Sequence, residues 1–192
     1  MATICIIGTS GVGKSFLVRQ LASKECSPAF FEGETGIIPK EVLESVFNGK
    51  NPMKRCEWYV NHYVETFRTA TNISKKLGIN CFVDGAPITA YANVYLDDKK
   101  YLDELLKIVK EVDEFKIDKI ILLTINKDKL KEFISKRGRS EEPVEETVER
   151  SLKLQDELIR LSKQQDNVII IDRSNLDFSK EEDLKIVMDK LK

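Results

Sequence analysis

The chain has 192 residues, with 31 Lys and Arg against 32 Asp and Glu and a formal net charge of −1 at pH 7. This length fits one well-packed domain, and the balanced charge excludes a global field that would favour nucleic acid or an anionic membrane surface. The sequence shows no signal peptide, no apolar run long enough to span a bilayer and no C-x-x-C pair, so we expect a protein of the reducing cytoplasm with buried free thiols at Cys5 and Cys81.

Apolar β-rich runs alternate with helical stretches along the chain. The runs predict strands at 2–7, 29–33, 80–84, 119–125 and 167–171. The stretches between them predict helices near 14–25, 39–48, 53–77, 90–115, 127–137, 143–165 and 180–191. This order predicts an α/β fold with a doubly wound, parallel, five-stranded sheet and a ligand crevice at the carboxyl ends of its strands. No linker divides the chain, so we expect one domain over 1–192.

The first strand runs directly into a match to the phosphate-binding motif G-x-x-x-x-G-K-[ST]. Its members are Gly8, Thr9, Ser10, Gly11, Val12, Gly13, Lys14 and Ser15. The glycines allow several amide N–H groups to point at one phosphate, and the next helix directs its positive end to the same place. We expect Lys14 to contact the β- and γ-phosphates of ATP and Ser15 to ligate Mg²⁺. The alternative is a glycine-rich turn with an incidental lysine, but the strand before it and the helix after it favour the triphosphate site.

The segments that follow the loop exclude two classes of P-loop protein. Pro87 occupies the glycine position of the D-x-x-G motif of a GTPase, and Lys129 occupies the aspartate position of N-K-x-D. Asp84 ends the third strand without the glutamate that normally follows it in a mechanical ATPase. A small-molecule kinase instead requires a carboxylate that activates the acceptor hydroxyl, an acid that holds the metal and mobile arginines over the transferred phosphoryl group.

A cationic segment at about 136–143 follows the fourth strand and a short helix, and it contains Arg137, Gly138 and Arg139. Two guanidinium groups that flank a glycine are suited to close over a triphosphate and to stabilise charge that develops in the transition state. A solvated connector is the alternative interpretation, because charged runs are commonly exposed.

The predicted helix 53–77 combines an aromatic row with polar residues. Tyr59, Tyr63 and Phe67 recur at four-residue spacing, and we interpret the row as part of the core. Asn61 and Arg68 are seven residues apart, so they share one face of the helix.

Taken together, these segments resemble the deoxynucleoside kinases, which are relatives of thymidylate kinase. Residues 137–142 resemble the LID of that family, residues 51–68 resemble its base-binding segment, and residues 168–183 are similar to its last strand and helix. The resemblance implies a P-loop kinase architecture with a short LID, ATP and Mg²⁺ as cofactors, a small-molecule nucleoside or nucleotide acceptor, and the family's usual homodimer. No nucleic acid or membrane partner is expected.

The resemblance also implies roles for single residues. Asn61 and Arg68 would contact the base, although Asn61 is one methylene shorter than the glutamine of the family. Asp84 would hold Mg²⁺ directly or through water, and Glu142 of the LID would contact the acceptor. Asp172 would form either the turn beside the adenine of ATP or a polar cap.

The general base is expected at the end of the second strand. The alignment favours Glu32 and leaves Glu34 as the alternative, because positions i and i+2 of a strand face the same way. Gly85 stands where the family has an arginine beside the phosphates. Three functions therefore stay open: a kinase for the 5′-hydroxyl of a (deoxy)nucleoside, a monophosphate kinase of thymidylate type, and an ATP-binding or ATPase regulatory protein.

Overall fold

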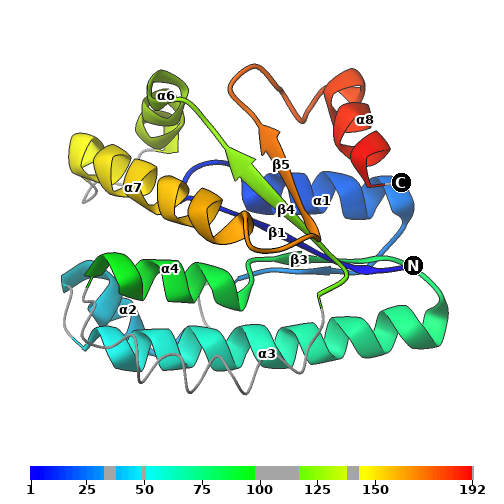
Figure 1. The fold of residues 1–192 in the computed structure, drawn as a ribbon, viewed down its shortest axis with the longest axis horizontal. Helices are drawn as coiled ribbons and strands as arrows, with labels where there is room; N and C mark the ends of the chain where they lie inside the picture. Colours follow the sequence, from blue (N-terminus) through cyan, green and yellow to red (C-terminus); the bar gives the residue numbers. More distant parts are fainter. Residues whose placement is uncertain (33–37, 49–50, 98–116, 138–142, 192) are drawn as a thin grey trace.

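The structure, a computed structural model, describes residues 1–32, 38–48, 51–97, 117–137 and 143–191 (Figure 1). Within these ranges, five strands form one parallel sheet in the order β2-β3-β1-β4-β5. They are β1 (Thr3–Gly8), β2 (Ala29–Phe30), β3 (Cys81–Asp84), β4 (Lys119–Thr124) and β5 (Val168–Asp172). Because every pairing is parallel, the carboxyl ends of the strands meet along one edge. The predicted doubly wound α/β sheet is confirmed.

Helices cover both faces of this sheet. The described helices are α1 (Lys14–Glu25), α2 (Lys40–Asn48), α3 (Pro52–Leu77), α4 (Pro87–Asp97), α6 (Lys127–Arg137), α7 (Val144–Ser162) and α8 (Glu181–Lys190). Helices α1 and α8 lie on one side of the sheet, and α3 and α4 lie on the other (Figure 1). Among the described helices, none is both long and apolar enough to cross a bilayer.

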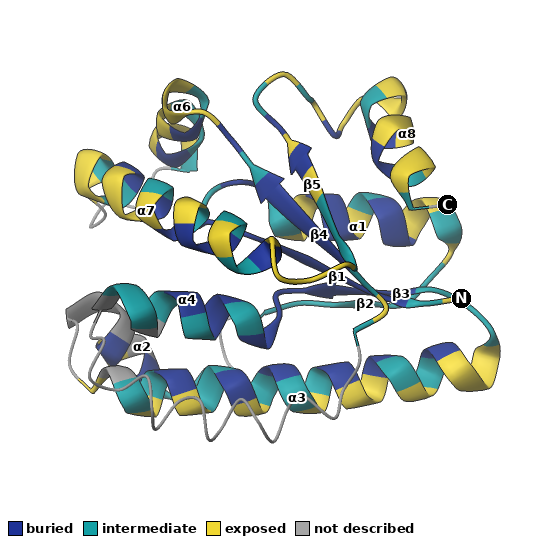
Figure 2. Cartoon of the chain, viewed as in Figure 1, coloured by how far each residue is buried: buried dark blue, intermediate teal, exposed yellow. Residues whose placement is uncertain are grey.

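The central strand β1 is buried on both faces, which explains its unbroken apolar sequence. Ile4 and Ile6 belong to the hydrophobic cluster that α1, α6 and α8 cover, whereas Cys5 and Ile7 belong to the cluster that α3, α4 and α7 cover. Figure 2 shows that the inner strands are buried and that the helices turn a buried stripe toward them and an exposed stripe toward solvent. The sheet is therefore held rigidly between two apolar layers.

Two predicted elements differ in extent from those of the structure. The strand expected at 29–33 ends at Phe30, because β2 is an edge strand that pairs with β3 only at Ala29 and Phe30. The helix expected at 90–115 begins at Pro87, a residue whose fixed φ suits the first turn, and its predicted part beyond residue 97 lies outside the described residues.

Candidate functional site

The loop of residues 8–15 connects β1 to α1 at the carboxyl edge of the sheet. Gly13 has φ of +93°, a left-handed conformation that favours glycine, and a β-carbon there would lie 1.5 Å from the guanidinium of Arg173. Nζ of Lys14 donates to the carbonyl of Thr9 at 3.3 Å across the loop. No side chain of the N-cap residue caps the first turn of α1, so backbone amide groups of this turn are directed to the same place. The loop therefore has the curvature and positive character that bind phosphate.

Ser15 and Asp84 meet where the loop passes the end of β3. Oγ of Ser15 donates to Oδ2 of Asp84 at 2.5 Å. Asp84 is only 3% exposed, and its Oδ1 has no hydrogen-bond partner among the described residues. A buried carboxylate oxygen without a partner is costly unless a cation or water meets it.

This pair fits the chemistry of Mg²⁺. Magnesium usually takes one or two protein oxygens and completes its octahedron with phosphate oxygens and water. Within the described ranges, no group of three or more His, Cys, Asp or Glu side chains forms a site that could hold a metal on its own. Ser15 and Asp84 could therefore hold Mg²⁺ together with a bound nucleotide.

Glu32 lies just beyond β2 and reaches the same edge of the sheet. The hydroxyl of Tyr63, from α3, donates a hydrogen bond to Oε1 of Glu32. Burial raises the pKa of Glu32 above its ordinary value; the charge of Lys14 lowers this pKa, the charge of Asp84 raises it, and the Tyr63 hydrogen bond lowers it. A carboxyl with a raised pKa beside the lysine of a phosphate loop is suited to accept a proton.

Gly85 and Tyr63 fit against each other beside Glu32. Gly85 has φ of +100°, and a β-carbon there would lie 2.4 Å from Cε1 of Tyr63. The ring of Tyr63 therefore fills the space that a side chain at position 85 would need. The core position predicted for the aromatic row is confirmed for Tyr63 and Phe67, which are buried. The contact with Glu32 was not predicted, although a buried phenol hydroxyl signals a hydrogen-bond partner.

The end of α6 brings one predicted arginine to the phosphate loop. Nη1 of Arg137 donates to Oγ of Ser10 at 3.0 Å. Three other predicted site residues, Glu34, Arg139 and Glu142, lie outside the described residues. β2 ends at Phe30, so Glu32 already lies beyond the strand that was expected to place it on one face with Glu34.

The structure does not bring Asn61 and Arg68 to this cluster. Both side chains are exposed, and helical geometry turns them away from the face of α3 that carries Tyr63. Arg68 pairs with Glu65 at 2.5 Å on the helix surface, while Asn61 borders a shallow hollow between α2 and α3 beside Trp58. The described side chain of α3 that reaches the candidate base is therefore the tyrosine.

The turn after β5 has a role that sequence reasoning missed. Oδ1 of Asp172 accepts hydrogen bonds from the amide and hydroxyl of Ser174, so Asp172 makes a polar cap for this turn. The next residue, Arg173, is 8% exposed and donates to the carbonyl of Val12 in the phosphate loop. Its guanidinium lies 4.7 Å from the ring centroid of Phe133 and 4.6 Å from that of Phe178. A buried cation therefore supports the loop, and the only sequence signal is an arginine directly after the last strand.

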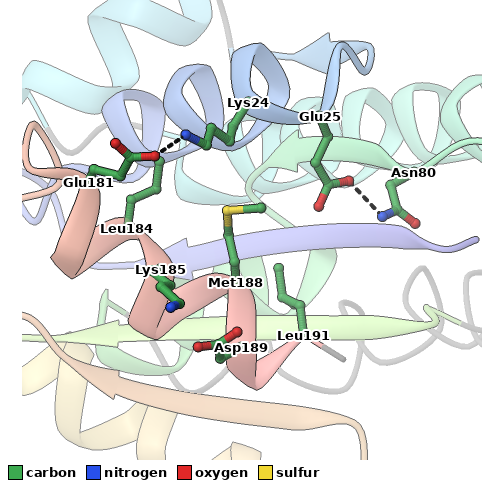
Figure 3. A pocket seen from close by; sticks show the side chains of 9 residues that line it. All are labelled: Lys24, Glu25, Asn80, Glu181, Leu184, Lys185, Met188, Asp189 and Leu191. Atoms are coloured by element: carbon green, nitrogen blue, oxygen red, sulfur yellow. Dashed lines mark hydrogen bonds and ion pairs between the residues drawn. The ribbon is translucent and has the colours of Figure 1, made fainter.

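A hollow between the end of α1 and α8 lies at the opposite edge of the sheet, before the start of β3 (Figure 3). Asn80 donates to Glu25 at 2.7 Å on its rim, and Lys24 forms an ion pair with Glu181. Leu184 and Met188 line its apolar part. None of the predicted site residues lines this hollow, so it is separate from the phosphate-loop cluster.

Comparisons with known proteins agree with this geometry at the level of the fold. No protein-family model matches the chain, and no curated protein matches its sequence. Solved structures do match it over nearly its whole length. A deoxyadenosine kinase from M. mycoides with bound dATP has a TM-score of 0.75 and 24% identity, and the match covers 100% of this chain and 99% of that one. The structure of that kinase with the products dCMP and dCDP gives a TM-score of 0.75 at 20% identity, with 98% of each chain covered.

Thymidylate kinase from Candida albicans has a TM-score of 0.70 and 14% identity, and the match covers 99% of this chain and 90% of that one. The chain therefore has the fold of the P-loop nucleoside and nucleotide kinases, as the resemblance predicted.

Proposed function

We propose that the protein is an ATP-dependent kinase that transfers the γ-phosphoryl group to the 5′-hydroxyl of a (deoxy)nucleoside. The observation that carries the proposal is the position of Glu32, a carboxyl with a raised pKa that lies near both the lysine of the phosphate loop and Asp84. The similarity in fold to a deoxyadenosine kinase over the whole chain supports the same assignment.

The described residues can divide the reaction among them. The loop of residues 8–15 binds the triphosphate, and Lys14 contacts its β- and γ-phosphates. Ser15 and Asp84 would hold Mg²⁺, which would supply positive charge to these phosphates. Glu32 takes the proton of the 5′-hydroxyl while the 5′-oxygen bonds to the γ-phosphorus, and the bond from that phosphorus to the β,γ-bridging oxygen breaks to leave ADP. Arg137, which already contacts Ser10, offsets the charge of the transferred group.

The charges around Glu32 favour a nucleoside over a monophosphate. An acceptor phosphate would need cations of its own beside the base. The charged groups that act on the pKa of Glu32, within the described part of the chain, are Lys14 and Asp84, and Lys14, the cation of this pair, serves ATP. A monophosphate kinase of thymidylate type is the second candidate, supported by the fold similarity to the Candida albicans enzyme.

The test is a panel of nucleosides and nucleoside monophosphates, each incubated with ATP and Mg²⁺, with the products separated by chromatography. We expect at least one nucleoside to become a 5′-monophosphate. Lys14→Ala, which removes a charge from the phosphate loop and leaves the core intact, should abolish the transfer while circular dichroism stays unchanged. Phosphorylation of monophosphates alone would select the second candidate. No transfer at all, with ATP still bound, would favour the regulatory ATP-binding protein.

A further inference from the structure

We propose that Tyr63 is a positioning residue for the Glu32 carboxylate and that Gly85 is the residue that admits its ring. This inference rests on the proposed function, because it treats Glu32 as the base. The hydroxyl of Tyr63 donates to Oε1 of Glu32 across a sequence separation of 31 residues. β2 ends at Phe30, so strand pairing does not extend to Glu32, and the hydrogen bond from Tyr63 is a contact that orients its carboxylate.

The donor itself is held firmly. Tyr63 is 2% exposed and packs in one cluster with Val60, Cys56 and Ala90, which joins α3 to α4. A ring packed in this way loses little further freedom when its hydroxyl makes a hydrogen bond, so the position of the oxygen is set by the core. Oε1 of Glu32 is engaged by this contact, which leaves Oε2 to accept the proton of an acceptor hydroxyl.

Gly85 makes this arrangement possible from the other side. Its amide donates to the carbonyl of Ile6 at 2.9 Å, which anchors the backbone immediately after Asp84. A β-carbon at this position would lie 2.4 Å from Cε1 and 3.0 Å from the hydroxyl oxygen of Tyr63. Any larger residue would push the ring, and with it the hydroxyl, away from Glu32. Tyr63 and Gly85 therefore act together: the glycine leaves room for the ring, and the ring holds its hydroxyl against Glu32.

The surroundings of Glu32 explain why such a contact matters. The charged and titratable groups that act on it come from three elements: Lys14 of α1, Asp84 at the end of β3, and Tyr59 and Tyr63 of α3. Lys14 attracts the carboxylate toward the phosphates, and Asp84 repels it. A fixed hydrogen bond holds the base between these opposing charges, and small errors in such alignment are costly to phosphoryl transfer.

The main experiment compares Tyr63→Phe with the wild type on the acceptor that the wild type phosphorylates. The variant keeps the ring against Gly85 and removes only the hydroxyl. We expect kcat to fall roughly 10- to 100-fold, as for a misplaced catalytic group, with KM for ATP unchanged and the melting temperature close to that of the wild type. Tyr91→Phe is the matched control. Tyr91 of α4 packs against the same cluster as Tyr63 and is not among the groups that act on Glu32 in the part of the chain described, so kcat of this variant should stay within about 2-fold.

The pairing with Gly85 is tested by a double-mutant cycle. Gly85→Ala should lower kcat by displacing the ring, and in the Tyr63→Phe background the same change should lower kcat much less, because the hydroxyl contact is already lost. Thermal unfolding is measured in parallel, since alanine at φ of +100° is strained in any case. Additive effects on kcat would overturn the role of Gly85.

Two further outcomes separate this inference from the proposed function. An active wild type with a Tyr63→Phe variant within 2-fold in kcat would overturn the positioning role and leave the function standing. A wild type without kinase activity would overturn the function. In that case, side-chain NMR titration of Glu32, assigned with Glu32→Gln, still tests the contact, because loss of the Tyr63 hydrogen bond must raise the pKa of Glu32. An unchanged pKa would overturn the contact itself.

Discussion

At the scale of single residues, Glu32 shows how function opposes stability. Burial disfavours the carboxylate form, so the folded protein holds this group at a pKa above its ordinary value. A group whose pKa is raised on folding contributes stability below its unfolded pKa and loses that contribution as the pH rises through the folded pKa. Above this raised pKa the ionised Glu32 therefore destabilises the fold, and the same charge makes it a base.

We predict that Glu32→Gln has opposite effects on activity and stability. It should lower kcat by roughly 10²- to 10⁴-fold, the usual contribution of a general base. Because glutamine stays neutral, the free energy of unfolding of the variant relative to the wild type should be higher at pH 8 than at pH 4. Urea unfolding at both pH values measures this difference. A variant that loses relative stability between pH 4 and pH 8 would contradict the sign of the pKa shift.

Asp84 carries the second prediction at this scale. Asp84→Asn keeps the volume of the side chain and removes the charge of the carboxylate that accepts a hydrogen bond from Ser15. The concentration of Mg²⁺ that gives half-maximal activity should rise, and kcat should fall, because the metal loses a carboxylate ligand. Steady-state kinetics against Mg²⁺ concentration test this, with Asp156→Asn, exposed on α7, as the control. Equal Mg²⁺ dependence in both variants would remove Asp84 from the metal site.

At the scale of elements, the turn between β5 and α8 contacts the phosphate loop and stabilises it. Arg173 brings its guanidinium between Phe133 of α6 and Phe178, and it donates to the carbonyl of Val12. Three segments that are distant in sequence thus meet at one buried cation. The shape of the loop depends on this contact as well as on its own glycines.

We predict that Arg173→Met weakens both stability and ATP binding. Methionine can fill part of the space between the two rings, but the carbonyl of Val12 loses its donor. Loss of this buried hydrogen bond should cost roughly 1–3 kcal/mol of unfolding free energy. The Kd for ATP, measured by calorimetry, should rise about 10-fold, the equivalent of roughly 1.4 kcal/mol. Lys153→Met, exposed on α7, is the control for loss of one positive charge. If ATP affinity is unchanged while stability falls, Arg173 supports the core alone.

At the scale of the whole molecule, the two hydrophobic clusters on the faces of the sheet pack against it and stabilise the arrangement of its strands. The inner and edge strands differ in burial: Ile120 of β4 is 1% exposed, whereas Ile170 of the edge strand β5 is 44% exposed. The central strands therefore carry most of the stability, and the edge strand carries less.

The same truncation at these two positions tests this distribution. Ile120→Ala should lower the free energy of unfolding by roughly 2–5 kcal/mol, because it leaves a cavity in the cluster that α3, α4 and α7 cover. Ile170→Ala should cost less than half as much, since solvent already reaches the side chain. Urea unfolding measures both values, and KM for ATP should be unchanged in each folded variant. Equal losses would show that the edge strand is as tightly packed as the centre.

The features of the fold and of the site that depend on neighbouring residues could be predicted from the sequence. The phosphate loop from Gly8 to Ser15 is contiguous, and the order of strands and helices follows from local apolar patterns, so both could be predicted and the fold is confirmed. Asp84 was placed at a strand end by the same reasoning. Arg137 could be named from its charged segment, and the structure brings it to Ser10.

Contacts between residues that are distant in sequence depend on how the elements pack, so they could not be predicted from local patterns. The early end of β2 depends on how far β3 pairs with it, and the separation of Asn61 and Arg68 from Glu32 depends on which face α3 turns inward. Tyr63 and Glu32 are 31 residues apart, and Arg173 and Val12 are 161 apart, so no local pattern links them. Packing chooses these contacts, because a buried hydroxyl or guanidinium must find its hydrogen-bond partner wherever the folded chain supplies one.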